Sequence, residues 1–195
     1  MSSLQPEVSQ TKPRVNSAFK HLMLVHWWMA AGYLVLFMNG KLMTELPEEV
    51  SFRGTMYDFH KSLGVLVIGL LTWRILVLLR VWWRKYTKRL PKFTPSWFRT
   101  FALHFSLYIF MWVVPVSGVF LSNSYQSHNV SLFGIGLPDF FPENKAMLEL
   151  GRNLHFWFAY TFLAFIILHA IAQWKVIRAN WRRFLGFINR IKNPG

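Results

Sequence analysis

Four long stretches of the chain are almost free of charged residues and alternate with shorter polar segments. They cover residues 21–40, 59–79, 101–121 and 153–174. Each has the length of roughly 20 residues that a helix rising about 1.5 Å per residue needs to cross a bilayer. The hydropathy pattern therefore predicts an all-α integral membrane protein, a bundle of four transmembrane helices.

Two residues interrupt the apolar character of these stretches. Arg74 lies well inside the second, and Pro115 lies in the interior of the third, where we expect it to kink the helix. Neighbouring transmembrane helices tolerate such a kink. Neither residue changes the prediction of four spans.

The segments that flank the spans divide the chain into three parts. Residues 1–17 are polar and predicted to be disordered, residues 18–176 form the four-helix transmembrane domain, and residues 177–195 form a basic tail. In this tail apolar residues recur at helical spacing with arginines between them. That pattern predicts an amphipathic helix lying on the inner membrane surface. The apolar residues are Ile177, Trp181, Phe184, Leu185 and Ile188.

The charge is strongly asymmetric along the chain. Lys and Arg number 22 against 8 acids, a net charge of +14, and most of the basic residues lie in the N-terminal tail, between residues 80 and 99, and after residue 174. Most of the acids lie in the other two connections. By the positive-inside rule, both termini are cytoplasmic. The excess charge therefore indicates topology and contact with the inner leaflet, and no nucleic-acid partner is predicted.

The chain contains no cysteine. This excludes disulfides, thiolate metal sites, iron–sulfur clusters and covalent attachment of a c-type haem. Chemistry inside the membrane must therefore come from other residue types.

Five of the seven histidines lie within the predicted spans, where ionisable residues are costly and mark functional sites by default. His26 is near the inner end of the first span, and His60 near the outer end of the second. On the fourth span, His155 is near the outer end, and His169 is about four turns further in, on the same face. His104 lies on the third span at the inner level.

The histidines match in depth across helices. His60 and His155 form an outer pair, and His26 and His169 an inner pair, separated by about 21 Å along the axis. Imidazole is a common axial ligand of haem iron, and two imidazoles on facing helices close both axial positions. The pattern therefore predicts two haems stacked across the bundle.

Other roles for these residues stay open at this point. A membrane histidine also forms hydrogen bonds between helices or serves in a proton relay. A zinc site is a weaker alternative, because the pairs are far apart and lack cysteine or nearby carboxylates. His104 either stabilises a haem propionate, lines a quinone pocket or simply packs.

Three basic residues are candidates for binding haem propionates. Arg74 lies at the depth of the inner pair, where its guanidinium either binds a propionate or extends to the inner interface. Lys61 and Arg152 flank the outer level and are candidates for the outer propionates. No residue is assigned a catalytic role.

At this point a family resemblance emerges from the motifs. Phe59-His60-Lys61-Ser62-Leu63-Gly64 resembles the HKS-x-G signature of the bacterial cytochrome b561 family. Other segments of the chain, in order, resemble the same family and carry the likeness over about residues 18 to 190. These are His26-Trp27, His104 with Tyr108 and Pro115, Phe133-Gly134, and the spacing of His155 and His169.

The resemblance implies a dihaem b protein of the bacterial inner membrane, with His26, His60, His155 and His169 as haem ligands. Members of this family exchange electrons with membrane quinone, and one branch is described as oxidising superoxide with ubiquinone as acceptor. The chain departs from the family at Val176-Ile177, where a His-His pair is usual, which leaves the position of a quinone site open.

Two classes of function compete on this basis. One is a membrane oxidoreductase that takes electrons from a donor at the outer face and exchanges them with quinone. The other is an electron-transfer and anchor subunit, like the similar membrane subunits of formate dehydrogenases and hydrogenases. The lack of long soluble loops for docking a partner favours the oxidoreductase.

Overall fold

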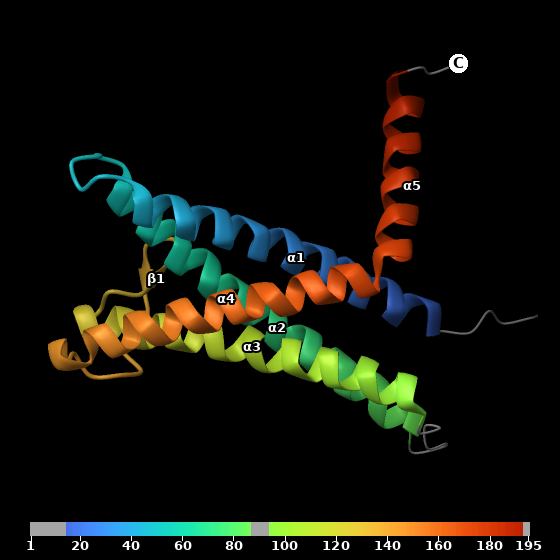
Figure 1. The fold of residues 1–195 in the computed structure, drawn as a ribbon, viewed down its shortest axis with the longest axis horizontal. Helices are drawn as coiled ribbons and strands as arrows, with labels where there is room; N and C mark the ends of the chain where they lie inside the picture. The colour runs from blue at the N-terminus through green and yellow to red at the C-terminus, as the bar shows by residue number, and fades with distance from the viewer. Residues whose placement is uncertain (1–14, 87–93, 193–195) are drawn as a thin grey trace, which may run out of the picture.

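The protein is helical over most of its length. The computed structural model describes residues 15–86 and 94–192 (Figure 1). Four of its helices are long and apolar enough to cross a membrane, which confirms the predicted four-helix bundle. The helices are α1 (Val15–Glu45), α2 (Arg53–Tyr86), α3 (Pro95–Tyr125), α4 (Leu148–Ala172) and α5 (Trp174–Lys192), with a short 3-10 helix η1 (Lys145–Met147) before α4.

The start of α3 shows how local sequence sets a helix boundary. Thr94 has an extended backbone, and its side chain accepts a hydrogen bond from the backbone N–H of Trp97. Pro95 follows at the first helical position, where its missing N–H costs nothing. The Thr-Pro pair therefore starts the helix several residues before the apolar stretch that crosses the membrane.

The four long helices associate as two pairs. Among the described residues, α1 packs on α2 and α3 packs on α4, while α2 and α3 meet less closely. Glycines allow close approach within each pair: a Cβ on Gly32 would lie 3.1 Å from Val67 Cγ2, and one on Gly151 would lie 3.1 Å from Leu121 Cα. Within the described residues, no Cα atom of α1 lies within 8 Å of one in α4. Side chains therefore bridge α1 and α4.

The end of the bundle with the α1–α2 connection is called the outer end below, following the predicted orientation. Here a two-stranded antiparallel hairpin follows α3, with strands β1 (Ser131–Leu132) and β2 (Ile135–Gly136). Its turn residues Phe133 and Gly134 have φ angles of 48° and 94°. Two positive φ angles are typical of the tight turns that join hairpin strands.

Helix α5 begins directly after α4. The chain turns at Gln173, and Figure 1 shows α5 running across the long axis of the bundle. The amphipathic segment predicted at 177–195 thus begins three residues earlier, as a helix from Trp174. Its placement on a membrane surface stays a prediction. Residues 193–195, most of the predicted N-terminal tail and Lys88, Arg89 and Lys92 lie outside the described residues.

Candidate functional site

The structure brings four of the membrane histidines together as two pairs. The ring centroids of His26 on α1 and His169 on α4 lie 6.1 Å apart, with an angle of 84° between ring planes. Those of His60 on α2 and His155 on α4 lie 6.3 Å apart, at 86°. These are the two pairings that depth along the sequence predicts.

The separation within each pair fits a metal ion held between the rings. Two imidazoles that bind one ion from opposite sides, through bonds of about 2.0 Å, have ring centroids roughly 6 Å apart. His104 also lies beside His169, but their centroids are only 5.0 Å apart, too close for this arrangement. The geometry therefore favours His26 over His104 as the partner of His169.

The ring of His155 is oriented by groups on α3. Its Nδ1 lies 3.0 Å from the carbonyl oxygen of Val114 and 3.1 Å from Ser117 Oγ. A metal-binding histidine commonly donates its other ring N–H to a carbonyl, which fixes the tautomer and ring orientation. Nδ1 is engaged in this way, which leaves Nε2 as the nitrogen available to a metal.

Two glycines make room for the outer pair. A Cβ on Gly118 would lie 3.0 Å from His155 Cε1, and a Cβ on Gly40 would lie 3.2 Å from His60 Cε1. Contacts this short are tighter than most real Cβ contacts, so each ring would have to shift by a few tenths of an ångström to admit a Cβ. Both glycines therefore leave room for a histidine ring on a neighbouring helix.

Unpaired nitrogens mark both sites. Nδ1 of His60 and Nδ1 of His169 are buried and have no hydrogen-bond partner in the part of the chain that the structure describes. Buried polar atoms without partners are rare in native proteins. A Cβ added at Gly64, one turn after His60, would also meet no described atom within 4 Å. A ring nitrogen that carries no hydrogen offers a lone pair to a metal. Unpaired ring nitrogens at both histidine levels, with open space beside His60, therefore fit a cofactor bound there.

The bundle's own side chains fill the layer between the two pairs instead. The buried cluster there consists of residues from α1, α2 and α4 whose positions fall between the histidine levels. Its members are Met29, Tyr33, Val67, Leu71 and Phe162. Close packing in the middle, between two levels of paired histidines, is compatible with one cofactor at each level.

Arg74 points into the bundle at the inner level. Its Nε donates a hydrogen bond of 3.0 Å to the hydroxyl of Tyr108 on α3, and its Nη1 lies 3.5 Å from the carbonyl oxygen of Leu22 on α1. The guanidinium therefore sits among α1, α2 and α3 close to the inner histidines. Whether it binds a propionate or extends to the inner interface stays a prediction.

His104 is held by its own helix. Its Nδ1 lies 2.7 Å from the carbonyl oxygen of Thr100 and donates to it, so the other ring nitrogen carries no hydrogen in the neutral ring. Beside His169, that nitrogen is an acceptor at the inner level. A role in a propionate or quinone site stays a prediction.

Lys61 and Ser62 fasten the outer loop to α2. The Lys61 ammonium donates to the backbone and side-chain oxygens of Asn129, each at 2.9 Å, and pairs with Asp58 at 2.9 Å. Ser62 Oγ donates to the carbonyl of Ser131 and accepts from the N–H of Phe133. The motif that sequence reasoning connected to haem thus ties down the loop beside the outer pair. Propionate binding by Lys61 or by the exposed Arg152 stays a prediction.

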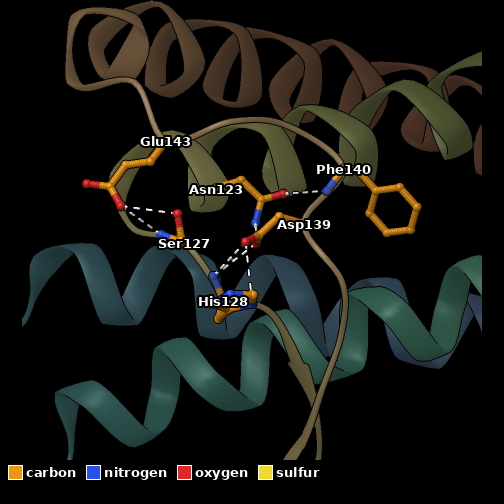
Figure 2. Close-up of polar contacts among 6 residues, drawn as sticks. All are labelled: Asn123, Ser127, His128, Asp139, Phe140 and Glu143. Carbon is orange, nitrogen blue, oxygen red and sulfur yellow. Dashed lines mark hydrogen bonds and ion pairs between the residues drawn. The ribbon is translucent and has the colours of Figure 1, made fainter.

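The acids of the same loop fold it onto the end of α3 (Figure 2). Fully buried Asn123 donates to Asp139 at 2.6 Å and accepts from the N–H of Phe140. The Asp139 carboxylate also accepts from the N–H of His128, and Glu143 accepts from Ser127. These carboxylates serve as structural acceptors within the loop.

A metal site built from protein side chains alone is not supported. Across residues 15–86 and 94–192, no group of three or more His, Cys, Asp or Glu side chains is placed to hold a metal ion. Two imidazoles per site suit a metal whose other ligands come from a macrocycle. The pairs therefore fit haem better than zinc.

Fold and site together define a class, a multi-pass membrane protein whose helices bring imidazoles together at two depths. The family model described as "Prokaryotic cytochrome b561" matches residues 20–186. The chain belongs to this family, and so is a membrane b-type cytochrome that acts in electron transfer. A curated relative, "Cytochrome b561 homolog 2" of Escherichia coli (strain K12), is 26% identical over 156 residues, 77% of this chain and 79% of the relative.

Proposed function

We propose that the chain is a dihaem b cytochrome of the bacterial inner membrane that passes electrons between a donor at the outer face and membrane quinone. The observation that carries this proposal is the meeting of two histidine pairs with ring centroids 6.1 and 6.3 Å apart. Family membership supports the haem and the membrane setting.

When bound, haem supplies one-electron chemistry through its iron. His60 and His155 would hold the outer iron, and His26 and His169 the inner iron. An iron held by an imidazole from each of two helices would favour electron transfer over oxygen activation. Oxidation of one quinol releases two electrons and two protons, and two one-electron sites in one chain match that number of electrons.

The donor and acceptor are identified by optical spectroscopy of the purified protein. Oxidised protein is mixed without oxygen with quinols, and dithionite-reduced protein with quinones. We expect the haem absorption to change with at least one member of the quinone class. If no quinol or quinone alters the spectrum while dithionite still reduces both haems, quinone exchange is rejected. A dehydrogenase that copurifies in mild detergent would support the anchor-subunit alternative instead.

Superoxide is tested as outer donor in the same instrument. If superoxide reduces the oxidised haems faster than it dismutates in free solution, it is a donor. If the reduction is slower, superoxide is rejected as a donor. Long-range attraction of the anion is not favoured, because the predicted outer side carries more acids than bases. At physiological salt, the interaction between exposed charges is largely screened beyond about 8 Å. Lys61 is also engaged with Asn129 and Asp58, so Lys61→Gln reports on loop anchoring as well as on charge.

Arg74 provides a test of the inner site. We propose that its guanidinium binds an inner-haem propionate, and its inward position beside Tyr108 supports this. Arg74→Leu removes a positive charge that favours the reduced, more negative haem. We expect the inner midpoint potential to fall by roughly 30–60 mV, since 59 mV corresponds to tenfold in a one-electron equilibrium.

Redox titration of the α-band absorption measures this shift. Arg80→Leu is a matched control, because Arg80 lies further along the same helix with an exposed side chain. Arg74→Lys keeps the charge and is expected to recover most of the potential. An unchanged potential in Arg74→Leu, with normal haem content, contradicts the propionate role.

A further inference from the structure

Two aromatic residues lie midway between the histidine levels on facing helices. Phe162 is midway in sequence between His155 and His169 on α4, and Tyr33 is midway between His26 and Gly40, the glycine that contacts His60, on α1. Residues spaced by two turns return to nearly the same face of a helix. Both side chains therefore share the faces of α1 and α4 that carry the histidines.

The two rings are in contact and buried. Their centroids lie 4.9 Å apart with an angle of 80° between the planes, and Phe162 and Tyr33 are 1% and 7% exposed. Phe37 lies one turn closer to the outer level on α1, and its ring centroid is 6.2 Å from that of Phe162. These separations lie within the range of favourable aromatic pairs. The three rings are thus in continuous contact across the gap between α1 and α4, with Tyr33 edge-on to Phe162 and Phe37 tilted against it, and are together called the stack below.

Packing does not explain why the residue at position 33 carries a hydroxyl. Its oxygen is buried and has no hydrogen-bond partner within the described segments. Burying a hydroxyl without a partner destabilises the fold relative to burying an apolar group. Oxidation of a tyrosine to a neutral radical needs a proton acceptor within hydrogen-bond distance, and none of the described side chains supplies one. Tyr33 is therefore suited to act through its ring and not as a redox group.

We infer that the stack of Tyr33, Phe162 and Phe37 is the bridge through which electrons pass between the two haem sites. This inference rests on the proposed dihaem function. One electron leaves a reduced site and arrives at the other, oxidised site, and no proton moves with it. Electron tunnelling weakens steeply with distance, and more steeply across empty space than through packed atoms. Rings in contact at the centre of the span therefore speed the transfer.

Removing a ring breaks the bridge. Tyr33→Leu or Phe162→Leu leaves a partly filled space at the centre of the layer, because a packed core relaxes only in part. We expect internal electron transfer to slow several-fold in both. Tyr33→Phe keeps the ring and is expected to transfer electrons at the wild-type rate.

Pulse radiolysis of the oxidised protein measures this rate, as the redistribution of an injected electron between the two haem signals. Phe165→Leu is the matched control, because Phe165 is one turn from Phe162 and stacks on Phe110 of α3, away from α1. Phe37→Leu provides a further test if a central variant does not fold. We expect a smaller slowing there, because Phe37 lies at the edge of the stack.

Each outcome decides between alternatives. Unchanged rates in Tyr33→Leu and Phe162→Leu, at full haem content, overturn the bridge. If Tyr33→Phe slows the transfer as much as Tyr33→Leu does, the hydroxyl is the group that matters. That result overturns the bridge as well. Equal slowing in Phe165→Leu shows a general loss of packing and also counts against it. A wild-type protein with fewer than two haems rejects the dihaem proposal itself, and haem quantitation detects this separately.

Discussion

His169→Ala is expected to remove the inner haem and leave the outer haem largely in place. The side chain supplies one of two imidazoles at the inner level, and its ring lies about four turns from that of His155 on the same helix. Between the two levels lies the buried cluster around Phe162, which is built from side chains of the bundle itself. Pyridine haemochrome quantitation should fall from about two haems to about one per chain.

His60→Ala is expected to have the reverse effect, with the outer haem lost and the inner one retained. The two variants are each other's control, because each removes one imidazole but at opposite ends of the bundle. His128→Ala adds a histidine control outside the spans, since this side chain is exposed in the outer loop. About one haem per chain in the wild type, or loss of both haems in each variant, would contradict two independent sites.

The four spans could be predicted because each depends on a property of contiguous residues. Arg74 is a single charge inside a long apolar stretch, and Pro115 lies within a helix that continues from Pro95 to Tyr125. Neither disturbs the length criterion for crossing a bilayer. The helix ends are less predictable, because they extend beyond the apolar core into polar segments, as Thr94 shows for α3.

The pairing of histidines could also be predicted, because depth in a membrane follows directly from position along a helix. What the sequence did not provide is the surroundings of each ring. Ser117 and the Val114 carbonyl contact His155 from another helix, and Gly40 contacts His60 across the α1–α2 pair. Such contacts depend on how two helices are rotated against each other, which hydropathy does not determine.

Lys61 shows a different limit of sequence reasoning. Its position next to His60 made it a candidate for an outer propionate, and that role stays a prediction, but the contact of Lys61 with the outer loop was not foreseen. Adjacent residues on a helix point about 100° apart, and Lys61 points to Asn129 in the loop after α3. A loop that far away in sequence gives no local signal of where it will fold.

Replacement of Gly118 is the second change for which we expect a large effect. Replacing a glycine in a helix with a larger residue normally favours the helix by up to about 1 kcal/mol. At this position the added Cβ would lie 3.0 Å from His155 Cε1 and 3.3 Å from its Nδ1. The rest of a leucine side chain extends beyond this Cβ, so the ring would have to move and disturb its contacts with Val114 and Ser117. Overpacking of this kind costs about 1–3 kcal/mol, which outweighs the gain in helix propensity.

We therefore expect Gly118→Leu to displace His155 and to lose most of the outer haem, while the inner haem and its redox titration stay unchanged. Gly40→Leu, which presses on His60 from the opposite pair of helices, is expected to act in the same way. Gly69→Leu is the matched control, because a Cβ at this exposed glycine meets no described atom within 4 Å. Haem quantitation and redox titration of each variant measure the result. Full outer-haem content in Gly118→Leu would show that His155 does not hold that haem in the position described.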